Sequence, residues 1–187
     1  PVRLQLSPYL SFYSNHFPNP EAKDFTNQIN GGMDVKWGLN QAYTLDATLI
    51  PDFGQVQSDP RILNLTPFEV RFDENRPFFT EGIELFSKGD FFYSRRIGGT
   101  PIFYDQVQNQ RKPSEVLISN PSESKLINAT KISGRNQNGL GIAVLNAITK
   151  STYATFENQE NKQQREVETN PLTNFNVLVL DKTLKNN

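Results

Sequence analysis

Hydrophobic and polar residues alternate along several stretches of the chain, and the clearest stretch runs from residue 33 to residue 49. Gln41 is the one exception among its odd positions, which are otherwise apolar or aromatic: Met33, Val35, Trp37, Leu39, Tyr43, Leu45, Ala47 and Leu49. Successive side chains of a β-strand point to opposite faces, so the pattern predicts one apolar sheet face. Turn-forming residues at 40–41 predict a hairpin with strands at 33–39 and 43–50.

Two further segments show the same alternation. In the first, residues 3–13, the apolar face carries Leu4, Leu6, Leu10 and Phe12. In the second, residues 129–149, the turn "NQNG" predicts another hairpin, whose second arm is bulky on one face and built from Gly and Ala on the other. A last strand is expected at about 174–184, and the polar residues 151–171 are expected to form an exposed loop. The prediction is an all-β meander of antiparallel hairpins.

The apolar sheet face needs a cover, and two covers are open. A second sheet would make a soluble β-sandwich, whereas lipid would make an outer-membrane β-barrel with a polar interior. The connection at 39–43 is short, while those at 15–27 and 151–173 are long and polar, and aromatic residues recur near the strand ends. Both features are typical of outer-membrane barrels. Pattern alone leaves the two folds about equally favoured.

A long connection at residues 51–124 separates two predicted strands, and it is rich in both charges and aromatic rings. Connections of this length are usually functional or folded in their own right. Arg side chains can pair with carboxylates there, and aromatic rings supply apolar area. We therefore expect a plug or constriction inside the barrel. Its candidate ion-pairing residues are Arg71, Arg76, Glu81, Glu84, Arg95 and Arg96. Its candidate aromatic residues are Phe78, Phe79, Phe91, Phe92 and Tyr93.

Composition narrows the chemistry. The net charge of −1 gives no global field for nucleic acid, and the chain has no cysteine, which excludes thiolate catalysis and Cys-based zinc sites. A single histidine, His16, argues against a Ser-His-Asp triad or a His-rich metal site. We predict no catalytic residues, metal or cofactor. The alternative is a hydrolase in which Glu81 and Glu84 pair with Asp73 or Glu74 as acid and nucleophile.

Four sequence blocks carry a family resemblance. They are "GGMDVKWGLNQAYTLDATLIPDFGQVQSDP", "NLTPFEVRFDENRPFFTEGIELF", "FFYSRRIGG" and "KISGRNQNGLGIAVLNA", which together lie within residues 31–147. The chain resembles a family of large Gram-negative cell-envelope proteins, in which a carbohydrate-binding module of family nine precedes a C-terminal β-barrel region of unknown function. The resemblance implies an outer-membrane location. It supplies no catalytic set.

The leading hypothesis is therefore that residues 1–187 are the N-terminal portion of an antiparallel transmembrane β-barrel, a single domain cut from a larger chain, with residues 51–124 as an inserted plug. Its expected partners are outer-membrane lipid and a solute related to carbohydrate, which it binds or transports. Two alternatives stay open: an envelope-associated hydrolase of glycans or peptides, and a soluble β-sandwich binding module.

Overall fold

A computed structural model describes residues 3–16, 25–51 and 71–184 of the chain. Helical segments are short: α1 (Pro77–Thr80), η1 (Lys88–Asp90), η2 (Ser94–Arg96) and η3 (Tyr104–Gln110). The strands are β1 (Arg3–His16), β2 (Phe25–Gly38), β3 (Tyr43–Leu49), β4 (Glu115–Ser119), β5 (Leu126–Arg135), β6 (Leu140–Thr149), β7 (Thr152–Asn158), β8 (Gln164–Asn170) and β9 (Thr173–Lys182). Among these residues, no helix has the length and apolarity needed to cross a membrane.

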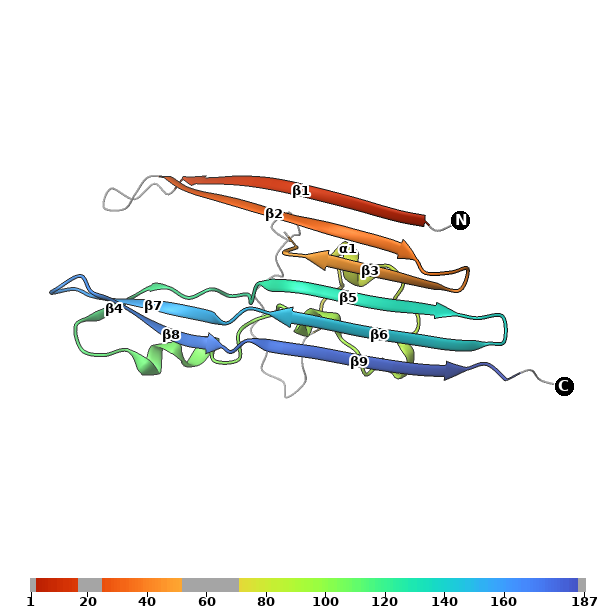
Figure 1. Ribbon diagram of the computed structural model, residues 1–187. Coiled ribbons are helices and arrows are strands. Elements are labelled where there is room, and N and C mark those ends of the chain that lie inside the picture. Colours follow the sequence, from red (N-terminus) through yellow and green to blue (C-terminus); the bar gives the residue numbers. More distant parts are fainter. Residues whose placement is uncertain (1–2, 17–24, 52–70, 185–187) are drawn as a thin grey trace.

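The strands form two antiparallel sheets, which confirms the all-β prediction. One sheet has six strands in the order β1-β2-β3-β5-β6-β9, and the other has three in the order β4-β7-β8 (Figure 1). The predicted hairpins are β2 with β3 and β5 with β6. The described strands do not close into a barrel, because β1 and β9 each have one neighbour and lie at the two edges. Pro8, which lacks a backbone donor, lies on the edge strand β1.

The two ends of the large sheet differ in their connections. The tight turns at 39–42 and 136–139 lie at the same end as both termini, and the three-stranded sheet lies at the opposite end (Figure 1). Asparagine side chains shape both turns, as their sequence predicted. Asn40 Oδ1 accepts the backbone N–H groups of Ala42 and Tyr43 at 2.7 and 2.9 Å, and Asn136 Oδ1 accepts that of Leu140 at 3.0 Å.

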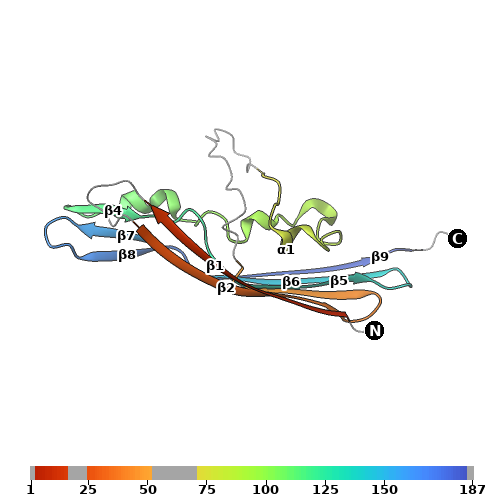
Figure 2. The same ribbon diagram turned by 90° about the horizontal axis from the view of Figure 1, so that it is seen from above.

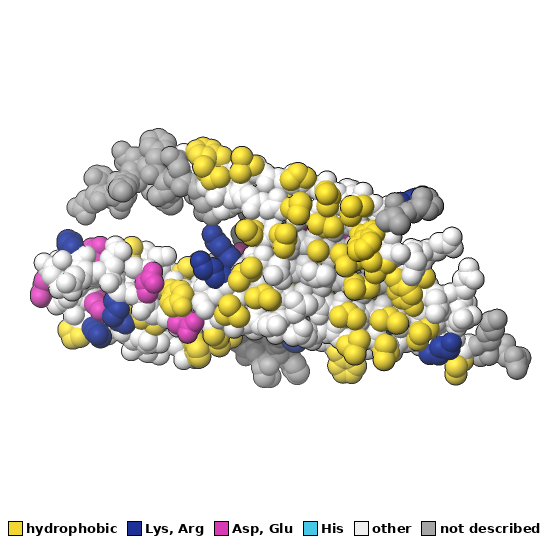
Figure 3. All heavy atoms as spheres, viewed as in Figure 1, with side chains coloured by type: hydrophobic (Ala, Val, Ile, Leu, Met, Phe, Trp, Pro, Cys, Tyr) yellow, Lys and Arg dark blue, Asp and Glu magenta, His cyan; other side chains and the backbone are white. Residues whose placement is uncertain are grey.

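The two faces of the large sheet have different covers. Residues 71–99, which we call the insert, lie against one face, as Figure 2 shows from above. Directly paired strand residues share a face, so the pairing shows which residues point away from the insert. The face that points away from the insert is the more apolar one. Its large side chains remain exposed, including Leu10 at 79% and Leu178 at 67%. We call it the bare face. Figure 3 shows hydrophobic side chains spread across it, with most charged side chains gathered near the smaller sheet.

The main core lies between the insert and strands β5, β6 and β9. Phe79, Phe86 and Ile97 of the insert are buried there. The small residues of the second hairpin arm receive them, because Ala143 and Ala147 leave room for large rings. Leu85, Leu126, Ala129 and Leu145 complete the buried cluster, and Phe78, Ile83, Phe92, Phe175, Val177 and Val179 pack against it.

The prediction of an exposed loop at 151–171 is wrong, because these residues form the hairpin of β7 and β8. Ala154 and Phe156 alternate inward and meet Val167, and η3 contributes Val107 to the same small core. Strand β4, within the long connection, pairs with β7 and completes the sheet. A few apolar residues are enough to stabilise this hairpin, because they alternate along the strands and the hairpin pairs with a third strand, β4. The polar composition of 151–171 gives no sign of that third strand.

Candidate functional site

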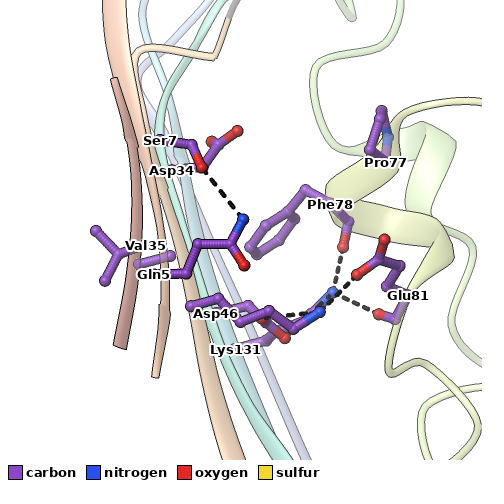
Figure 4. Close-up of a pocket in the computed structure, with 11 residues that line it drawn as sticks. Gln5, Ser7, Asp34, Val35, Asp46, Pro77, Phe78, Glu81 and Lys131 are labelled. Carbon is purple, nitrogen blue, oxygen red and sulfur yellow. Dashed lines mark hydrogen bonds and ion pairs between the residues drawn. The ribbon is translucent and has the colours of Figure 1, made fainter. Parts of the chain in front are cut away.

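A cavity of about 290 Å³ opens between the insert and the polar face of strands β1, β2, β3 and β5. Its lining combines an amide, a hydroxyl, charges of both signs and one aromatic ring (Figure 4). The lining residues are Gln5, Ser7, Asp34, Val35, Lys36, Asp46, Ala47, Pro77, Phe78, Glu81 and Lys131. Period-two geometry explains the polar set, since Gln5, Ser7, Asp34, Lys36, Asp46 and Lys131 point away from the bare face.

Lys131 joins the sheet to the insert. Its side chain is 1% exposed, and its Nζ donates hydrogen bonds to the backbone carbonyls of Phe78 and Glu81. These carbonyls lie in and just after α1, where helical carbonyls lack an internal partner. Nζ also lies 3.9 Å from Asp46 Oδ2 and 4.5 Å from the centre of the Phe78 ring.

Lys36 of β2 forms a second link between the large sheet and the insert. Its Nζ lies 2.7 Å from Glu81 Oε2 and 3.9 Å from Asp46 Oδ1. The hydrogen bond from Lys36 lowers the pKa of Glu81. The Lys36–Glu81 pair is solvent-exposed, so it adds little to stability, whereas Lys131 is a buried attachment.

Arg76 organises the interior of the insert. Its Nε and Nη2 donate to the two carboxylate oxygens of Glu74 at 2.8 and 2.7 Å. Its other hydrogen bonds reach the carbonyls of Ser94 at 2.8 Å and Ile97 at 2.6 Å. Burial alone would raise the pKa of Glu74, but hydrogen bonds from Arg76 and Ser94 outweigh it and lower that pKa. The guanidinium also lies 4.4 Å from the ring centre of Phe79.

The other predicted arginines are distributed around the same segment. Arg71 pairs with Asp90 at 2.7 Å, and its guanidinium lies 5.5 Å from the ring centre of Tyr93. The guanidinium of Arg96 lies 5.8 Å from the same ring centre. Arg95 lies 4.0 Å from Glu74. The carboxylate of Glu74 is therefore the point at which the arginines 76 and 95 come together.

The predicted aromatic residues occupy different environments. Phe79 is buried in the main core, and Phe78 meets it edge-on with ring centres 5.0 Å apart. Phe92 packs beside Phe86, and the hydroxyl of Tyr93 accepts the backbone N–H of Phe72 at 2.8 Å. Phe91 is 88% exposed.

The carboxylates of the alternative hydrolase have separate partners. Glu74 forms an ion pair with Arg76, and Glu81 forms one with Lys36 of β2. Glu84 lines a second, smaller hollow of about 220 Å³ with Lys88 and Arg135. Within the described ranges, no group of three His, Asp or Glu residues could hold a metal ion.

Sequence reasoning missed Lys131 and the contacts of Lys36 and Asp46. The one sequence feature that could have indicated them is a charged residue within a predicted strand of otherwise uncharged residues. The acceptors that Lys131 reaches are backbone carbonyls, and no side-chain pattern announces those.

The two antiparallel sheets and the insert-lined cavity define an all-β protein. A family described as Domain of unknown function (DUF5916) matches residues 1–187, the whole of the chain. The chain belongs to this family, which agrees with the expected membership of a family of unknown function. Comparison with curated proteins and with solved structures gives no match.

Proposed function

We propose that this chain forms part of the wall of an outer-membrane β-barrel, and that the insert narrows its interior for binding or passage of a small hydrophilic solute. The observation that carries the proposal is the inverted arrangement of the large sheet. Its more apolar face is bare, and the face covered by the insert is the one that carries most of the sheet's charged residues, with an apolar contact confined to β5, β6 and β9. A soluble sandwich buries its apolar faces against each other, whereas a barrel presents them to lipid.

The charge distribution supports the same orientation. On the bare face, the described side chains of β1, β2, β3, β5 and β6 are uncharged, and Lys182 at the end of β9 is a charged exception. On the other face, β1, β2, β3 and β5 carry charged residues, Leu145 and small residues occupy β6, and β9 carries Asp181 beside the apolar Phe175, Val177 and Val179. These charged residues are Arg3, Asp34, Lys36, Asp46, Lys131, Arg135 and Asp181. Hydrocarbon accepts uncharged side chains, and a wet interior accepts ions.

The edge of the apolar region crosses the sheet obliquely. One row of paired residues is apolar throughout: Leu4, Trp37, Leu45, Ile132, Val144 and Leu178. The row through Leu6 begins with Val35 and Ala47 but continues with Thr130, Asn146 and Asn176. Asn146 Nδ2 donates to Asn176 Oδ1 at 2.8 Å, so these amides partly satisfy each other. An oblique boundary is what a planar membrane produces on tilted strands.

Membrane integration tests the proposal. The native protein should sediment with outer membranes, resist carbonate extraction, and migrate faster on a detergent gel before boiling than after it. Recovery as a monodisperse soluble protein without detergent would contradict the proposal.

A matched pair of variants makes the test specific. Val144→Arg places a charge on the bare face, and against lipid we expect it to cost about 2–4 kcal/mol and prevent stable insertion. Gln164→Arg places the same charge on the smaller sheet and should be tolerated. If the bare face meets water, both variants will behave alike, because exposed substitutions are nearly neutral. A carbohydrate solute is the further expectation that the family resemblance adds.

A further inference from the structure

The insert is attached to one half of the large sheet far more closely than to the other. Over β5, β6 and β9 its contact is dry, and Phe79, Phe86 and Ile97 are at most 2% exposed. The approach is so close that a Cβ on Gly141 of β6 would lie 2.9 Å from a methyl carbon of Leu85. Lys88 of the insert also pairs with Asp181 of β9 at 2.7 Å.

Over β1, β2 and β3 the same insert leaves a wet gap. Gln5, Asp34 and Lys36 point to the insert's side of the sheet, yet all three are exposed, and the cavity of about 290 Å³ separates this wall from α1. Figure 4 shows Gln5, Ser7 and Asp34 on the strand side, facing Phe78 and Glu81 on the insert side. The gap therefore has one wall from the sheet and one from the insert.

Lys131 marks the boundary between the two halves. It lies at the edge of the cavity, and its hydrogen bonds to the carbonyls of Phe78 and Glu81 hold the end of α1 on β5. Gly82 follows directly, and a Cβ there would lie 3.2 Å from Ser133 Oγ. Lifting the insert would expose the buried rings and leave a buried ammonium without its acceptors, which is strongly unfavourable.

We infer that the insert is a fixed internal structure, and that solute passes or binds in the gap between it and the β1–β3 wall. The inference rests on the proposed barrel and locates its path. Amide, hydroxyl and carboxylate groups line the gap. Its two lysines each lie beside a carboxylate of opposite charge, Lys36 beside Glu81 and Lys131 beside Asp46. The path suits small solutes rich in hydrogen-bonding groups, of low net charge.

Cysteine labelling tests the path, because the natural chain contains no cysteine. Ser7→Cys places a thiol in the gap, Ala143→Cys beneath the insert, and Leu6→Cys on the bare face. In the membrane-embedded protein, a hydrophilic methanethiosulfonate reagent should modify Ser7→Cys at least about tenfold faster than the other two, since thiolate attack requires water access. Equal labelling at Ser7→Cys and Ala143→Cys would overturn the inference.

A cross-link tests whether the insert moves. In Leu85→Cys/Gly141→Cys, the shorter side chain at position 85 removes the methyl that a Cβ at position 141 would meet, and the end of the Arg135 side chain, 3.1 Å from that Cβ, must also shift. A disulfide formed on oxidation, verified by its reversal with a reductant, would tie the insert to β6. Flux of a small polyol into vesicles should be unchanged by oxidation and blocked by modification of Ser7→Cys. Loss of flux on oxidation would overturn the fixed insert. The gel shift before boiling verifies folding of each variant, and its absence in the native protein would instead contradict the barrel.

Discussion

Ala143 and Val144 are adjacent on β6, yet Ala143 is 0% exposed beneath the insert and Val144 is 40% exposed on the bare face. Strand geometry makes neighbours face opposite sides, but it does not decide which side is covered. Here the smaller residue is covered and the larger one is bare. At these two neighbouring positions, the insert covers the face with the smaller side chain and leaves the face with the larger side chain bare.

Enlarging each residue should have opposite consequences. Ala143→Leu should lower the free energy of unfolding by about 1–3 kcal/mol, because the core with Phe79 and Phe86 has no room for added methyl groups. Val144→Leu should change it little, since its side chain meets no protein layer in the described structure. Denaturant unfolding followed by tryptophan fluorescence measures both. Equal losses would mean that a protein layer covers the bare face.

The stability of the insert should depend on the several hydrogen bonds that the Arg76 guanidinium donates at once, and not on its charge alone. Arg76→Lys keeps the charge but cannot reach Glu74, Ser94 and Ile97 together, so we expect a loss of about 2 kcal/mol. Arg111→Lys, at an exposed position, is the control and should be nearly neutral. Faster proteolysis within residues 71–99 should accompany the first variant alone. An undisturbed insert in Arg76→Lys would show that these hydrogen bonds are dispensable.

The smaller sheet should lose stability in acid through Glu115. Arg165 donates to both of its carboxylate oxygens, at 2.9 and 2.6 Å, and lowers the pKa of Glu115 from 4.5 to about 2. A lowered acid pKa gives stability that is fully present above about 4.5 and is lost as the pH falls toward about 2. Hydrogen exchange of β7 and β8 amides should rise in that window. Glu115→Gln should flatten the dependence, and an unchanged profile would exclude this pair as its source.

The oblique edge of the apolar region predicts different depths within one row of paired residues. Leu6 and Asn176 belong to the same row on β1 and β9. Nitroxide labels at these positions should report lipid around residue 6 and a more aqueous setting around residue 176. Oxygen and a water-soluble nickel complex, used as collision partners, measure the difference. Equal values would place the membrane plane along the rows instead.

Local pattern predicted much of the large sheet. The alternation at 33–49, the asparagine turns and the small face of the second hairpin each follow from side-chain period and turn chemistry, and each occurs in the structure. These features depend on residues close in sequence, which is why sequence reasoning reaches them.

The unpredicted features depend on contacts between distant residues. The hairpin of β7 and β8 gains its stability partly from β4, more than thirty residues upstream in sequence. Likewise, Lys131 is a lone charge on its strand until α1 supplies two carbonyl acceptors from about fifty residues away. The insert residues were identifiable by their composition, but the division into a dry half and a wet half was not.

The edge strands β1 and β9 run in opposite directions, since every neighbouring pair in the six-stranded order is antiparallel. Any strands that bridge these two edges while keeping the alternation must therefore be even in number. An odd complement would force one parallel seam into the ring. The orientation of two strands in this chain thus fixes the parity of the proposed barrel, whatever its final size.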